Sequence, residues 1–100
     1  MKIWVDDMRP APDGYQWCKS VNEVKSVILD MEFHSWARPT LIDIDHDAGD
    51  FADDGGDYIK LLDWLEETGR NYPIRIHSMN PVGVENMRRI IQRNGLTEVH

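Results

Sequence analysis

The stretch TLIDIDHDAGD, residues 40–50, changes from apolar to charged within a few positions. Its first part, TLIDI at 40–44, is a short apolar run of the kind that forms a buried strand. The second half of the stretch, DIDHDAGD at 43–50, holds four carboxylates and one histidine. A buried strand cannot continue into so much charge, so the sequence predicts that this strand ends at a polar site on the edge of the fold.

Three further runs predict strands. KIWV at 2–5 and PIRIH at 73–77 are short, apolar and rich in β-forming residues, and YQWCKS at 15–20 is a weaker candidate. Helical patterns separate and follow the last three strands, and this alternation favours a parallel sheet.

The helical patterns run over about 20–33, 57–69 and 80–95, where apolar residues recur every three or four positions. Ser20 and Glu23 have the spacing of a capping box at the start of the first. The other two patterns end at glycines, and the third has a proline in its first turn.

We therefore predict a single α/β domain over residues 1–100, with a small, open, mostly parallel sheet and flanking helices. A short loop, DDMRPAPDG, joins the first two strands. With right-handed crossovers, the strand order is 2-1-3-4, as in flavodoxin-like folds.

Composition narrows the functional class. Eighteen acidic against eleven basic residues give a net charge of −7, which disfavours broad binding to nucleic acid. No apolar run approaches the roughly 20 residues of a membrane helix, and we expect neither a signal peptide nor a membrane span. Cys18 is the only cysteine, so an intrachain disulfide is impossible. These features predict a cytoplasmic protein.

Polar residues follow three of the predicted strands. In a parallel sheet the carboxyl ends of the strands share one edge, which is where open α/β sheets bind their ligands. We expect one site there, formed by Asp6 and Asp7 after the first strand, Asp45, His46 and Asp47 after the third, and His77, Ser78 and Asn80 after the fourth.

Carboxylates gathered at one edge repel one another, and a divalent ion is the simplest relief. The predicted metal ligands are Asp6, Asp7, Asp45 and Asp47. An all-oxygen set suits Mg²⁺ or Mn²⁺, whereas a contribution from the two histidines would shift the preference toward Mn²⁺ or Zn²⁺. The alternative is that acids merely favour the start of the next helix, and we adopt it for Asp50, Asp53 and Asp54.

His77 and His46 are the candidate proton carriers, since imidazole titrates near neutral pH. The alternative for a histidine at a strand end is a structural role. Arg9, Ser78 and Asn80, with the start of the third helix, are the candidate phosphate-binding groups. For Arg9 the competing interpretation is an ion pair with the acidic residues after the first strand.

Three motifs resemble those of the cyclic-phosphate processing receiver-like domains, and the resemblance covers nearly the whole chain. They are WVDDMRPAPDGY, IDHDAGD with DGGDYIKLLDWL after it, and IHSMNPVGVENMRRII. The resemblance implies a receiver-like fold and a phosphoesterase activity on a cyclic phosphate of a nucleotide or a nucleic-acid end.

Compared with signalling receivers, Asp6 and Asp7 resemble the acidic metal-binding pair, and Asp45 resembles the phosphate acceptor, with Asp43 as the alternative by register. This sequence lacks three features of the receiver pattern: the first helix, which a short loop replaces, a clear fifth strand, and a lysine after Ser78. Two other functions stay open: a signalling receiver, and a ligand-binding adaptor without catalytic activity.

Overall fold

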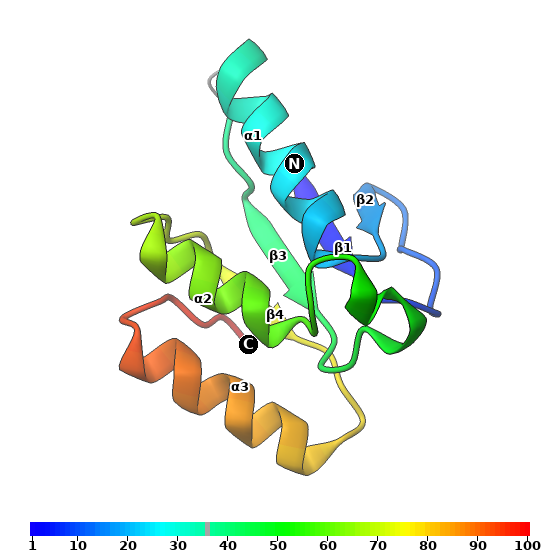
Figure 1. Ribbon diagram of the computed structural model, residues 1–100. Helices are drawn as coiled ribbons and strands as arrows, with labels where there is room; N and C mark the ends of the chain where they lie inside the picture. Colours follow the sequence, from blue (N-terminus) through cyan, green and yellow to red (C-terminus); the bar gives the residue numbers. More distant parts are fainter. Residues whose placement is uncertain (36) are drawn as a thin grey trace.

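The four predicted strands form one parallel sheet in the order β2-β1-β3-β4, which confirms the predicted strand order (Figure 1). The computed structural model describes residues 1–35 and 37–100. Its strands are β1 (Lys2–Val5), β2 (Tyr15–Cys18), β3 (Leu41–Ile44) and β4 (Ile74–Ile76).

The three predicted helices are also present, as α1 (Val21–Ser35), α2 (Ile59–Glu67) and α3 (Pro81–Arg93). The Ser20 hydroxyl accepts a hydrogen bond from the Glu23 N–H at 3.0 Å, as a capping box requires. A short 3₁₀ helix, η1 (Gly49–Asp53), was not predicted, because its acidic sequence has no apolar periodicity. Over the described residues, no helix is both long and apolar enough to cross a membrane.

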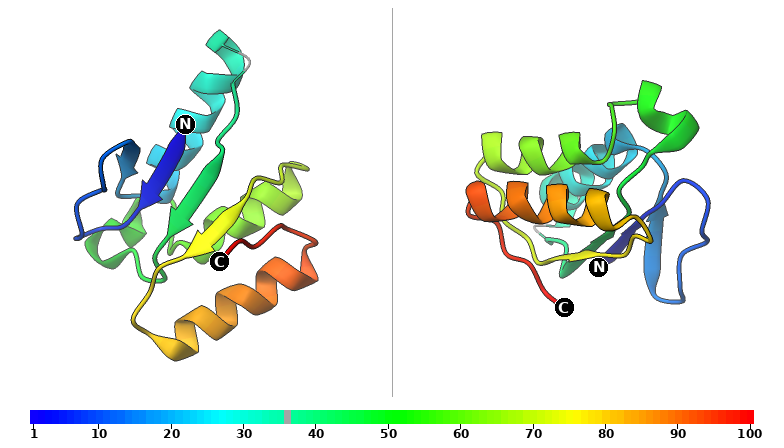
Figure 2. Two further views of the ribbon diagram at one scale, coloured as in Figure 1. Left: turned by 180° about the vertical axis from the view of Figure 1, so that it is seen from behind. Right: turned by 90° about the horizontal axis from the view of Figure 1, so that it is seen from below.

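All three α-helices lie on the same side of the sheet (Figure 2). The connections from β2 to β3 and from β3 to β4 both step in the same direction across the sheet, so right-handed crossovers place α1 and α2 on one face. The step in the opposite direction, from β1 to β2, is made by a loop rather than a helix. In the part of the chain that the structure describes, the other face therefore carries no helix, and we call it the helix-free face.

The core lies between the sheet and the helices. Alternate strand residues, such as Ile3, Val5, Ile42 and Ile44, are fully buried. The helices contribute the apolar stripes that the sequence predicts, with Val24 and Ile28 from α1, Leu61, Leu62 and Leu65 from α2, and Met87 and Ile91 from α3. This packing fixes the strand ends that carry the polar residues.

Asp54 ties the acidic segment after β3 to the start of α1. Its carboxylate accepts hydrogen bonds from the Ser20 hydroxyl at 2.6 Å and from the Asn22 amide at 3.1 Å. These bonds lower the pKa of Asp54. A Cβ atom at Gly55 would clash with the Asn22 backbone, so glycine is required for this close approach. Asp54 was expected to favour the start of the following helix, and it binds the preceding one instead.

In residues 1–35 and 37–100, a fifth strand is represented by a single bridge. Glu98 pairs in parallel with Ile74 at the outer edge of β4, and the Val99 N–H donates to the Ile74 carbonyl at 2.7 Å. This bridge lies at the start of β4, away from the polar ends of the strands.

Candidate functional site

Three carboxylates meet at the ends of β1 and β3. One oxygen from each of Asp6, Asp7 and Asp45 lies within 4.8 Å of the other two. The backbone keeps the two strand ends level, since the Asp45 N–H donates to the Val5 carbonyl at 2.9 Å. Asp47 lies outside this group, and its Oδ1 accepts from the Gly49 N–H at 2.9 Å. The three oxygen atoms could hold a divalent ion.

Asp6 is the most buried of the three, with 1% of its surface exposed. Its Oδ1 accepts from the N–H groups of Met8 and Arg9, both at 2.9 Å, and its Oδ2 lies 3.0 Å from Nε2 of His77. Burial alone would raise the pKa of Asp6. The backbone hydrogen bonds and His77 outweigh that effect and lower it, so this carboxylate is charged at neutral pH.

Asp7 shows the repulsion expected of crowded acids. Burial raises the pKa of its carboxyl, and the charges of Asp6, Asp45 and Asp47 raise it further. A divalent ion would relieve this repulsion, so the charges as well as the oxygen donors fit such an ion.

A pocket of about 330 Å³ opens beside the carboxylates. It is lined by most of the residues that the sequence nominates: Arg9, Asp45, His46, Asp47, Ser78 and Asn80, with Met79. Arg9 is exposed, and it contacts Asp6 through its main-chain N–H rather than through its guanidinium. No lysine lines this pocket.

His46 enters the pocket from the segment after β3. Its N–H donates to Oδ1 of Asp45 at 2.8 Å, which fixes its backbone beside the carboxylates. Its ring rests against Gly83 in the first turn of α3, where a Cβ atom would overlap the imidazole. Gly83 therefore gives His46 the space that it occupies.

His77 lies behind the carboxylates and does not line the pocket. Its Nδ1 is 2.7 Å from Oδ1 of Asp43, and its Nε2 is the atom that contacts Asp6. The ring stacks on Trp4, with 3.7 Å between centroids and 7° between planes. Both ring nitrogens are thus engaged by carboxylates.

The start of α3 is capped by its own sequence. The Asn80 side-chain oxygen accepts from the N–H groups of Val82 and Gly83, both at 3.1 Å. A phosphate was expected to use such free N–H groups, and Asn80 already occupies these two. The Ser78 hydroxyl accepts from the Asn80 N–H at 3.2 Å and keeps its own proton to donate.

The family model of the cyclic-phosphate processing receiver domain matches residues 1–93. The chain belongs to this family. No curated protein and no solved structure matches it.

In this cyclic-phosphate processing receiver domain, two residues are candidates for the counterpart of the receiver acceptor, Asp43 and Asp45. Their positions favour Asp45. Asp45 follows the last residue of β3 and joins the acidic group with Asp6 and Asp7. Asp43 lies inside the strand, where it is 3% exposed and contacts His77.

The sequence offered Asp43 only as an alternative acceptor and not as a partner of His77, and it gave Trp4 no role at the site. Both lie inside strands, where alternation predicts only which face a residue occupies. The register of the two strands could have shown that these residues are neighbours, because Trp4 pairs with Asp43 across β1 and β3. A carboxylate within an apolar strand needs a buried partner, and that requirement pointed to a neighbouring cation or imidazole.

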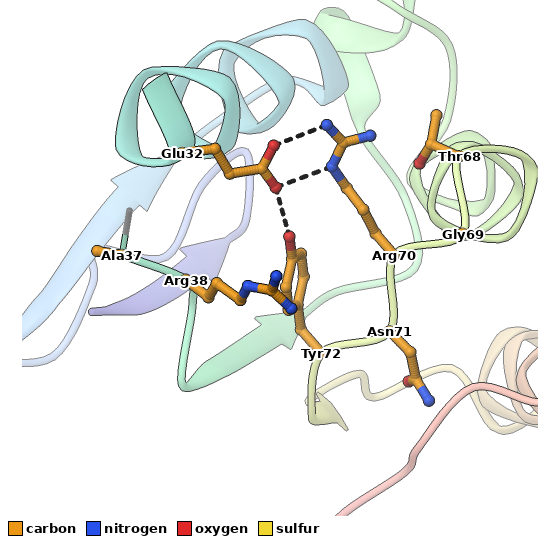
Figure 3. Close-up of a pocket in the computed structure, with 8 residues that line it drawn as sticks. All are labelled: Glu32, Ala37, Arg38, Thr68, Gly69, Arg70, Asn71 and Tyr72. Atoms are coloured by element: carbon orange, nitrogen blue, oxygen red, sulfur yellow. Dashed lines mark hydrogen bonds and ion pairs between the residues drawn. The ribbon is translucent and has the colours of Figure 1, made fainter. Parts of the chain in front are cut away.

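A second pocket, of about 360 Å³, lies between the segments that follow α1 and α2, at the opposite edge of the sheet (Figure 3). Glu32 points into it from α1. Its carboxylate accepts from Nε and a terminal nitrogen of Arg70, at 2.9 and 2.7 Å, and from the Tyr72 hydroxyl at 2.6 Å. These groups satisfy one another, so the pocket is a structural junction rather than the candidate site.

Replacing Glu32 with glutamine should reduce the free energy of unfolding by about 1 to 2 kcal/mol at neutral pH, since charge-assisted hydrogen bonds are lost from a partly exposed site. The bonds from Arg70 and Tyr72 lower the pKa of Glu32 from 4.5 to about 2. Because the folded pKa is depressed, this contribution is present above pH 4.5 and disappears as the pH falls toward 2. Urea titrations of both proteins across this range should converge at low pH. If the difference in free energy of unfolding between the two proteins stays the same at every pH, the stability does not come from the charged Glu32 carboxylate.

Proposed function

We propose that this domain is a metal-assisted phosphoesterase that opens a cyclic phosphate of a nucleotide or a nucleic-acid end. The observation that supports this most is the position of the acidic group of Asp6, Asp7 and Asp45 beside a pocket lined by Arg9, Ser78 and Asn80, whose side chains can donate hydrogen bonds to a phosphate. Membership of the cyclic-phosphate processing family supports the same substrate class.

Mg²⁺ or Mn²⁺ is the ion that the proposal assigns to the three carboxylates, because all three donors are oxygen atoms. Zn²⁺ is less suited, since His77 has both ring nitrogens engaged and His46 is not in the group. When bound, the ion would offset the charge of the phosphate and help to activate a water. Asp47, from its place in the pocket wall, would orient that water.

The guanidinium of Arg9, the Ser78 hydroxyl and the Asn80 amide would hold the phosphate oxygens. A water oxygen forms a new bond to phosphorus and gives up one proton, and one of the two ester P–O bonds of the ring breaks, so that one water is consumed and the proton it loses balances the one that the departing oxygen gains. The departing oxygen takes a proton and becomes a hydroxyl group, so the product is a phosphomonoester.

His46 is the better placed of the two histidines to supply that proton, because its ring lies in the pocket wall. His77 could take part in proton transfer only by giving up a hydrogen bond to Asp6 or Asp43. We therefore assign proton transfer to His46, and a supporting role to His77.

A panel of cyclic phosphates tests the proposal. Purified protein would be incubated with 2′,3′-cyclic and 3′,5′-cyclic nucleotides and with an oligonucleotide ending in a 2′,3′-cyclic phosphate, with Mn²⁺ or with a chelator. Phosphorus NMR should show conversion of at least one diester to a monoester only when the ion is present. If every substrate stays intact while Mn²⁺ binding is measured in the same sample, the esterase proposal fails and the adaptor function is favoured.

Signalling by phosphorylation is the second candidate, favoured by the position of Asp45 in the acidic group. The absence of lysine from the pocket lining argues against a lasting acyl phosphate. Incubation with acetyl phosphate and Mg²⁺ should therefore leave the intact mass unchanged. A stable gain of one phosphoryl group, lost in Asp45→Asn, would favour the signalling function instead.

A further inference from the structure

His77 and Asp43 form a hydrogen-bonded chain that ends on Asp6. It runs from Oδ1 of Asp43 to Nδ1 of His77 over 2.7 Å, and from Nε2 of His77 to Oδ2 of Asp6 over 3.0 Å. Three strands supply its members, since Asp43 lies in β3, His77 follows β4 and Asp6 follows β1. The chain thus links three adjacent strands of the four-stranded sheet.

The members of this chain have little freedom to move. Asp43 and Asp6 are 3% and 1% exposed, and the His77 side chain is 13% exposed. Trp4 covers one face of the imidazole, and the Trp4 indole N–H is itself fixed by the Arg9 carbonyl at 2.9 Å. The His77 backbone is held by its N–H bond to the Ile44 carbonyl at 2.9 Å. The ring is therefore held at both nitrogens and on one face.

The chain determines how Asp6 can bind an ion. A carboxylate offers about four lone-pair directions. The N–H groups of Met8 and Arg9 occupy Oδ1, and His77 occupies one direction on Oδ2. The remaining direction on Oδ2 is left for a cation. Without the hydrogen bond to His77, the carboxyl group of Asp6 could rotate away from Asp7 and Asp45.

We propose that Asp43 and His77 are positioning residues that hold Asp6 in the orientation that binds a divalent ion. The inference rests on the proposed metal site and deepens it. Groups that hold the ligands of a metal by hydrogen bonds commonly contribute about 10-fold to 100-fold to metal affinity. A buried pair with only a structural role would contribute to stability and leave the metal affinity unchanged.

Asp43→Asn tests this role, because asparagine has nearly the same shape but lacks the charge that holds the imidazole N–H. We expect Mn²⁺ affinity, measured by calorimetry without substrate, to fall about 10-fold to 100-fold in a variant that remains folded. Arg75→Gln is the matched control. Arg75 contacts the other oxygen of Asp43 at 3.5 Å and is half exposed, so its loss should change the affinity less than about threefold.

The outcomes separate this inference from the metal site itself. If the wild-type protein binds no Mn²⁺, the metal site fails and the positioning role fails with it. If the wild type binds Mn²⁺ and folded Asp43→Asn binds it equally well, the positioning role is wrong and the metal site stands.

A measurement on the wild type remains informative if Asp43→Asn does not fold. In nitrogen-15 NMR of the histidine rings, a ring N–H proton of His77 should be visible and protected from exchange with water because both nitrogens face carboxylates, and the Nε2 signal should shift on addition of Mg²⁺. Rapid exchange at both nitrogens, or an unchanged His77 while the Asp7 and Asp45 amides shift, would overturn the proposal.

Discussion

Replacing His46 with glutamine will lower the turnover of the cyclic phosphate by about a hundredfold to ten-thousandfold, the usual effect of removing a positioned acid or base. Glutamine keeps a polar side chain of similar length in the pocket but cannot transfer a proton at neutral pH. The variant should still bind Mn²⁺, because the proposed ligands of the ion are Asp6, Asp7 and Asp45 and do not include His46. Steady-state kinetics on the substrate found in the panel would measure the loss.

His34→Gln is the control for this experiment. His34 is exposed on α1, and its Nε2 lies 3.3 Å from the exposed carboxylate of Asp30, one helical turn before it. It should leave turnover unchanged. If His46→Gln turns over at the wild-type rate in a folded sample, proton transfer does not depend on His46, and the assignment is wrong.

Replacing Asp45 with asparagine will abolish the response of the protein to divalent ions. In the wild type, an ion at a hundred times its dissociation constant stabilises the folded state by about 2.7 kcal/mol. For a domain of this size that corresponds to a rise of roughly 10 to 20 °C in Tm. Asp45→Asn replaces one of the three carboxylates by a neutral amide and should show almost none of this rise.

When a chelator keeps the protein free of metal, Asp45→Asn should have a slightly higher Tm than the wild type. The reason is that one of the charges that repel Asp7 is gone. Asp50→Asn is the matched control, since Asp50 is an exposed acid in η1 outside the acidic group. It should keep the full response to the ion. A wild-type melting curve that is indifferent to Mg²⁺ and Mn²⁺ would remove the metal from the account.

The fold could be predicted because local pattern and global topology agree. The apolar strands, the helical stripes and the right-handed crossover rule together determine the order β2-β1-β3-β4. The same logic placed Asp6 and Asp45 at one edge, since both follow the last residue of a strand in a parallel sheet.

The contacts within the site could not be predicted in the same way. Strand ends indicated that His77 and the carboxylates are close, but side-chain direction decides whether an imidazole faces a pocket or a neighbouring acid. His77 turns to Asp43 and Asp6, whereas His46 turns to the pocket and Gly83. Similarly, Asp54 binds α1 through residues more than thirty positions away in the sequence, and no local pattern encodes that contact.

The most direct test of the account is a titration of metal-free wild-type protein with Mn²⁺, in which ion binding and hydrolysis of the cyclic phosphate are followed in the same samples. Binding would be read from the electron paramagnetic resonance of free Mn²⁺, and hydrolysis from the appearance of the monoester. We predict that hydrolysis is absent in chelator and rises in proportion to the occupancy of one site. Full hydrolysis in chelator, or hydrolysis that does not follow Mn²⁺ binding, would contradict the proposal that Asp6, Asp7 and Asp45 hold the ion that this reaction requires.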